Sequence, residues 1–242
     1  MNLFIQQVFL QVVYLLTVSF SLPEGRPWNR RCSITTYYDR TNAGQIRPRW
    51  AGKDSMNKRR QVQEKHEVFI VDAFITWWES QTGEKLRVIS RPHPLPPEAI
   101  VQSDQRTTWI EVTDAFHSDE WAQDLYSYAA PEEAHKPMGL GPYVDMDAQT
   151  ASRFAMLLKK KFSKQSYAEP HKKYGPGILL VGMQSPWFNA QTCDLMRAEC
   201  ERTDWTTSQG YFSRVFITYS SLNLQTFEEW KWDAQPSPAR DR

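Results

Sequence analysis

Two glutamates in the stretch PEAIVQSDQRTTWIEVT are the residues of this chain best suited to chemistry. Glu111 lies between Ile110 and Val112, and a carboxylate among apolar side chains is costly to bury unless it meets a cation or hydrogen-bond donors. Glu98 begins the preceding segment. Two carboxylates brought together repel each other, whereas a hard divalent cation binds both through oxygen. We therefore expect Glu98 and Glu111 to bind magnesium or manganese.

A hairpin is the simplest element that would bring these two glutamates together. The segments 98–102 and 107–113 have the composition of short strands, and the polar residues between them predict a turn. Side chains two apart in a strand share a face of the sheet. Glu111 is therefore expected to point with Thr113 and away from Asp114.

Helices and further strands complete a mixed α/β pattern. A helix is expected over 61–81, where Glu67 lies one turn before Val71 on the buried stripe. Another is expected over 147–165, with an apolar stripe beside a polar one. The order predicts a mixed central sheet flanked by helices. The remaining expected elements are strands at 86–90, 175–184 and 214–220, and helices at 119–129 and 190–201.

The order helix, three strands, helix, strand, with Pro97-Glu98 followed by Glu111-Val112-Thr113, resembles the restriction-endonuclease-like, or PD-(D/E)XK, nuclease superfamily. The resemblance covers Met56 to about Tyr219. It implies magnesium-dependent hydrolysis of phosphodiesters in DNA, less often in RNA. It also implies site residues: Glu98 matches the Asp of the motif, Glu111 its second acid, and Glu67 the acid that some members contribute from the first helix.

Two positions depart from the pattern of that superfamily. Glutamate replaces aspartate at position 98, and Thr113 stands where a lysine is expected. The ammonium of that lysine would orient the attacking water and offset the charge that builds up at phosphorus. The resemblance implies Lys160, on the helix expected over 147–165, as a replacement, with Lys136 in a loop as the alternative. Without a replacement, the fold would bind nucleic acid without cleaving it.

The charge of the chain favours phosphate contacts at local sites only. A formal net charge of +1 argues against a generally basic surface, but basic residues cluster at 58–60, 159–161 and 172–173. No dinucleotide-binding fingerprint, phosphate-binding P-loop or G-x-S-x-G motif is present, which disfavours dehydrogenases, NTPases and serine hydrolases. The expected partner is nucleic acid, with DNA ahead of RNA. The residues expected to contact it are Gln149, Arg153, Lys164 and Lys136.

The first 55 residues differ in character from the rest. Residues 3–22 carry no charge, as in a membrane anchor or secretory segment, but three glutamines interrupt them and no basic residue precedes them. Residues 23–55 have no sustained period, and Met56 opens a polar helix start. We expect Met56 to be the natural first residue, a single domain over 56–232 and a disordered tail over 233–242.

Three functional hypotheses follow. The first is a cytoplasmic, metal-dependent nuclease in which Glu98 and Glu111 bind the ion and Glu67 or Lys160 positions the water. The second is a catalytically inactive module on the same fold that binds nucleic acid or protein. The third is a membrane-anchored or secreted protein of unknown role, which requires residues 3–22 to be a targeting segment.

Overall fold

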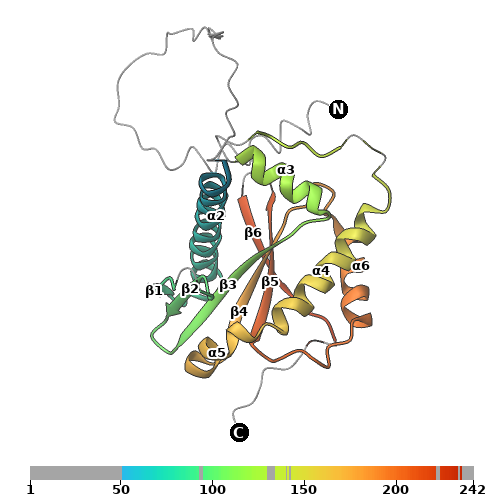
Figure 1. Ribbon diagram of the computed structural model, residues 1–242. Coiled ribbons are helices and arrows are strands. Elements are labelled where there is room, and N and C mark those ends of the chain that lie inside the picture. The colour runs from blue at the N-terminus through green and yellow to red at the C-terminus, as the bar shows by residue number, and fades with distance from the viewer. Residues whose placement is uncertain are drawn as a thin grey trace, which may run out of the picture. The chain divides into compact units, whose positions relative to one another are not determined.

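The computed structural model describes residues 51–92, 95–129, 134–139, 141, 143–221, 224–233 and 235, with side chains from residue 60 onward except at 221 and 224. The chain divides into two compact units, Met1–Lys58 and Arg59–Arg242, and the second carries the whole sheet. In chain order the elements are α2 (Ala51–Thr82), β1 (Arg87–Ser90), β2 (Ala99–Gln102), β3 (Thr107–Ala115), α3 (Asp119–Ala129), α4 (Met146–Phe162), the 3-10 turn η1 (Gln165–Tyr167), α5 (Ala168–Tyr174), β4 (Gly177–Met183), α6 (Ala190–Arg202), β5 (Phe212–Ser221) and β6 (Leu224–Trp230) (Figure 1).

Six strands form one sheet, and their order in space is their order along the chain. Strands β1, β2 and β3 pair antiparallel, β3, β4 and β5 pair parallel, and β6 returns antiparallel to β5. Each parallel step is bridged by helix, as parallel neighbours require a long crossover. The fold is therefore the mixed α/β sheet flanked by helices that the sequence predicts.

Helices lie on both sides of the sheet (Figure 1), and each side has its own hydrophobic core. Helix α2 packs Val71, Phe74 and Trp78 on one face, and each is 3% exposed or less. Helices α4 and α6 cover the other face, where Phe154 and Leu158 are fully buried. Strand β4 lies between β3 and β5 and all of its residues are buried, which explains its uninterrupted apolar sequence.

The boundaries of most elements match the expectation to within a few residues, but α2 is longer. It begins at Ala51, whereas the expected start was residue 61. The first turns carry no apolar stripe, so the periodicity of the sequence did not reveal them. It ends at Thr82, as expected, and Gly83 follows with a φ of 72°, the left-handed conformation that glycine adopts most easily after a helix.

The sequence pattern does not predict strand β6, helix α5 or the 3-10 turn η1. Phe227 and Trp230 are three residues apart, a spacing typical of a helix face. In a strand an odd spacing instead places them on opposite faces, and the two side chains do join different cores. Helix α5 is too short, at 7 residues, for periodicity to reveal it.

None of the helices in the described part of the chain is both long and apolar enough to cross a membrane. The uncharged run 3–22 lies outside the described residues, as does most of the tail 233–242.

Candidate active site

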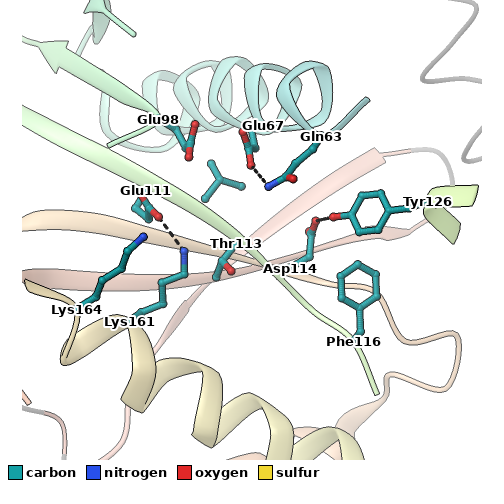
Figure 2. Close-up of a pocket in the computed structure, with 11 residues that line it drawn as sticks. Gln63, Glu67, Glu98, Glu111, Thr113, Asp114, Phe116, Tyr126, Lys161 and Lys164 are labelled. Atoms are coloured by element: carbon teal, nitrogen blue, oxygen red, sulfur yellow. Dashed lines mark hydrogen bonds and ion pairs between the residues drawn. The ribbon is translucent and has the colours of Figure 1, made fainter. Parts of the chain in front are cut away.

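The pairing of β2 with β3 brings the two glutamates to the same end of the hairpin. Ala99, the first residue of β2, pairs with Ile110, so Glu98 comes directly before the paired segment and Glu111 continues β3 beyond it. The negative charge of Glu111 acts on Glu98, as expected of neighbouring carboxylates. Figure 2 shows both carboxylates turned toward one cavity, which both residues line.

That cavity has a volume of about 270 Å³ and lies where α2 meets β3 and the end of α4. Its lining is strongly polar, with four carboxylates facing two lysines. A site of this composition suits cations and polar ligands, because apolar ligands would gain little there. The lining residues are Gln63, Glu67, Glu98, Glu111, Val112, Thr113, Asp114, Phe116, Tyr126, Lys161 and Lys164.

Glu111 is held by two donors on one of its oxygens. The residue is 2% exposed, and its Oε1 accepts hydrogen bonds from Lys161 Nζ at 2.8 Å and from Tyr167 Oη at 2.7 Å. Its Oε2 is equally buried and accepts no hydrogen bond from any described residue. A buried oxygen with free lone pairs is costly unless a further ligand satisfies it.

Glu67 and Glu98 form an acid pair on the opposite wall. Gln63 Nε2 donates to Glu67 Oε1 at 2.7 Å, and the Glu98 carboxyl is hydrogen-bonded to Glu67. Burial, and after it the negative charges of Glu67 and Glu111, raises the pKa of Glu98 to about 8. Burial also raises the pKa of Glu67. Without a cation, this wall therefore holds a proton near neutral pH.

Asp114 of β3 lines the cavity and contacts α2, α3 and the residue that follows β4. Its Oδ1 lies 3.1 Å from His66 Nε2 of α2 and accepts from Gln184 Nε2 at 3.1 Å, while Tyr126 Oη of α3 donates to Oδ2 at 3.3 Å. Burial alone would raise the Asp114 pKa, but the charge and hydrogen bond of His66, together with the hydrogen bonds from Gln184 and Tyr126, outweigh it and lower the pKa. Gly182, beside Asp114 on β4, makes room for the carboxylate, since a Cβ there would overlap Oδ1.

The residues present fit a hard divalent cation. The unsatisfied Glu111 Oε2 and the raised pKa of Glu98 both mark oxygens that a cation would stabilise. No group of three or more His, Cys, Asp or Glu side chains within the described ranges is arranged to hold a metal ion. Mg²⁺ usually binds one or two carboxylates and completes its shell with water and substrate phosphate.

Lys161 occupies the cavity, whereas Lys160 does not. Lys160 is exposed and is absent from the lining, because neighbouring residues of a helix point about 100° apart. Lys161 lies three residues after the buried Leu158 and so continues the buried stripe of α4 to the site. Lys160 therefore does not line this cavity, and its neighbour Lys161 does.

Of the residues expected to contact nucleic acid, only Lys164 lines the cavity, with its Nζ 5.1 Å from the centre of the Tyr167 ring. Gln149 is exposed in the first turn of α4 and donates to the Val144 carbonyl. Arg153 pairs with Asp119 at 2.8 Å, and Lys136 is exposed. Those three do not lie at the cavity. Gln149 precedes Lys161 by more than three turns, about 18 Å along the helix axis.

Several residues of the site escaped the sequence reasoning. Tyr167 gave no signal, since it lies in a short 3-10 turn that only the folded chain brings to Glu111. The position of Lys161 was indicated in the sequence, because its helical spacing places it on the same face as the apolar residues of α4. His66 and Asp114 are 48 residues apart, and nothing in either local pattern indicates their contact.

Comparison of the chain with family models, curated proteins and solved structures gives no match. A function must therefore be argued from the geometry of the site.

Proposed function

We propose that this chain is a divergent PD-(D/E)XK-like hydrolase that cleaves phosphodiester bonds in nucleic acid, DNA ahead of RNA, with magnesium or manganese. The observation that carries the proposal is the convergence of Glu98 and Glu111 on one polar cavity, with the Lys161 ammonium 2.8 Å from Glu111. The order of helix α2, strands β1 to β3, helix α4 and strand β4 along the chain supports it.

Glu98 and Glu111 would hold the ion in this proposal. When bound, the ion would neutralise negative charge on the phosphoryl oxygens and lower the pKa of a water molecule. It would also replace the proton that the pair Glu67 and Glu98 holds, because a nearby positive charge favours ionised carboxylates.

The lysines would supply the charge that Thr113 cannot. Lys161, fixed by Glu111, presents a cation beside the ion site and does what the missing motif lysine would do. Lys164 is exposed at the rim of the cavity, where an ammonium can contact a phosphate of the incoming strand.

Glu67 is the residue best placed to act as a base. Its pKa is raised, chiefly by burial, so its carboxylate accepts a proton more readily than an exposed glutamate does. Gln63 donates to Glu67 Oε1 and fixes its orientation over the cavity. Glu67 would thus take the proton of the water that attacks phosphorus.

The test is a cleavage assay with single-stranded DNA, double-stranded DNA and RNA, each with Mg²⁺, Mn²⁺ or a chelator. We expect metal-dependent cleavage that Glu111→Gln lowers by about 100-fold or more, because the variant loses a charged ligand of the ion that stabilises negative charge at the reacting phosphate. Glu228→Gln, which changes an exposed carboxylate on β6, serves as the matched control and should cleave normally.

A specific observation also favours a second function, a nucleic-acid-binding module without catalysis. Lys161 is engaged by Glu111, and position 113 carries no charge. This function predicts binding that weakens steeply with salt and needs no metal. Binding by the wild-type chain without any product, in Mg²⁺ and in Mn²⁺, would replace the hydrolase proposal with this one.

A further inference from the structure

Tyr167 is a buried residue that contacts the site without lining the cavity. It is fully buried, and its hydroxyl donates to Glu111 Oε1 at 2.7 Å, the same oxygen that Lys161 contacts. Oε2 accepts nothing from the residues that the structure describes. The two oxygens of the Glu111 carboxylate therefore differ, since Oε1 accepts two hydrogen bonds and Oε2 accepts none from the described residues.

The ring of Tyr167 is fixed on several sides. It stacks on Trp109 with centroids 5.5 Å apart and an interplanar angle of 27°, and it meets Phe212 and Tyr211 edge-on at 5.2 Å and 6.1 Å. Trp109 is itself anchored, since its Nε1 donates to the Gly175 carbonyl at 2.8 Å. A hydroxyl carried by such a ring has one position, and it directs the Glu111 carboxylate into one orientation.

The phenol also remains a donor over the whole working pH range. Burial, and after it the negative charge of Glu111, raises the Tyr167 pKa. A protonated hydroxyl beside a carboxylate donates a short, charge-assisted hydrogen bond and stabilises its ionised form.

We propose that Tyr167 is a positioning residue that, by occupying Oε1 of Glu111, leaves Oε2 as the oxygen that binds the divalent cation. The inference rests on the proposed function for the identity of the ligand, but it concerns cation binding and not cleavage. Partners that orient a metal-binding side chain typically contribute a factor of about 10–100 to metal affinity.

The experiment measures Mn²⁺ binding by isothermal titration calorimetry to the full chain. Tyr167→Phe removes only the hydroxyl and keeps the ring that packs on Trp109. We expect its Kd for Mn²⁺ to rise by about 10–100-fold. Tyr211→Phe is the matched control: it removes a hydroxyl from the same aromatic cluster, one that points to Gln165 and not to Glu111, and should keep the wild-type Kd.

A double variant separates positioning from general loosening of the fold. Glu111→Gln removes the group through which Tyr167 is proposed to act, so adding Tyr167→Phe to it should change the Kd no further. Circular dichroism and urea unfolding of each variant check that the fold is kept. An equal loss of affinity in the Glu111→Gln background would assign Tyr167 a merely structural role and overturn the proposal.

The remaining outcomes distinguish this proposal from the proposed function. Wild-type protein that binds Mn²⁺ but cleaves nothing, with weaker binding by Tyr167→Phe, would refute the hydrolase and support the role of Tyr167. Unchanged Mn²⁺ affinity in Tyr167→Phe overturns that role even if the wild type is an active nuclease. Wild-type protein that binds no Mn²⁺ overturns both.

Discussion

Glu98 is the residue through which pH acts most directly on this site. Its folded-state pKa of about 8 lies above the ordinary value of 4.5, first because of burial and then because of Glu67 and Glu111. The folded state therefore holds this proton more tightly than the unfolded chain does. Glu98 contributes stability that is full below about pH 4.5 and is lost as the pH rises through 8.

We expect the free energy of unfolding, measured in urea without divalent cations, to contain a component that falls between pH 4.5 and 8. Glu98→Gln should remove that component, because an amide does not titrate. Glu228→Gln should leave the pH dependence as it is, since that carboxylate is exposed. Identical pH profiles for the wild type and Glu98→Gln would contradict the assignment.

Lys161 and Lys160 give a second prediction at the level of single residues. Lys161→Met removes the ammonium that contacts Glu111 and should lower the cleavage rate by about 100-fold to 1000-fold, the usual effect of losing one stabilising donor. Lys160→Met alters an exposed side chain one residue away. Rate measurements at saturating Mg²⁺ compare the two variants, and a larger loss in Lys160→Met would return the role to that residue.

The sequence indicated three of the four carboxylates that line the cavity, Glu67, Glu98 and Glu111, but neither Asp114 nor most of their partners. Alternation within a strand is a local rule, so it places Glu111 on the side of Thr113 and opposite Asp114 from the sequence alone. The donors to Glu111 come from 50 and 56 residues away, and such contacts depend on how α4 and η1 dock on the sheet. The position of these elements on the sheet depends on side-chain packing in the folded protein, which the local sequence pattern does not show.

At the scale of elements, Asp114 is the link between the strand that carries Glu111 and the helix that carries Glu67. Its contact with His66 ties β3 to α2, and its contact with Tyr126 ties β3 to α3. The glycine at position 182 makes this possible, because the neighbouring strand must leave space for a carboxylate inside a packed layer.

Gly182→Ala should therefore disturb the link. The added methyl group overlaps Asp114 Oδ1, so we expect a loss of about 1–3 kcal/mol in the free energy of unfolding, the usual effect of overpacking. Gly139→Ala is the control, since a Cβ there would meet no atom within 4 Å. Urea unfolding measures both variants. Equal stability of Gly182→Ala and the wild type would show that Asp114 moves aside freely.

Elements with a repeating pattern were predicted well, and those without one were not. The stripes of α2 and α4 are periodic over several turns, and the buried run of β4 has no polar interruption. Strand β6 gives Phe227 to one core and Trp230 to the other, with Glu228 and Glu229 between them, so its sequence shows no regular alternation of apolar and polar residues. Its pairing with β5 is a property of the assembled sheet.

At the scale of the whole second unit, the cavity lies beside strand β3, which contributes to both cores. Strand β3 sends Trp109 to the core under α4 and Ile110 to the core under α2, and its next residues are the acids of the site. A site on a strand that is packed on both faces is held rigidly, as binding of a small cation requires. The two cores thus position the chemistry as well as stabilising the fold.

This dependence on two cores predicts how the chain tolerates truncation. The first buried apolar residue of the described α2 is Ile70, and the core under α2 takes no residue before it. A chain of residues 56–242 should therefore fold and retain its cavity. We expect its Tm to lie within about 4 °C of that of the full chain, the shift that corresponds to 1 kcal/mol in a domain of this size.

Thermal unfolding and Mn²⁺ titration of the two chains measure this. A chain starting at residue 71, which lacks His66 and Glu67, serves as the disruptive comparison. Loss of a cooperative transition in 56–242 would mean that residues before Met56 help to form the core.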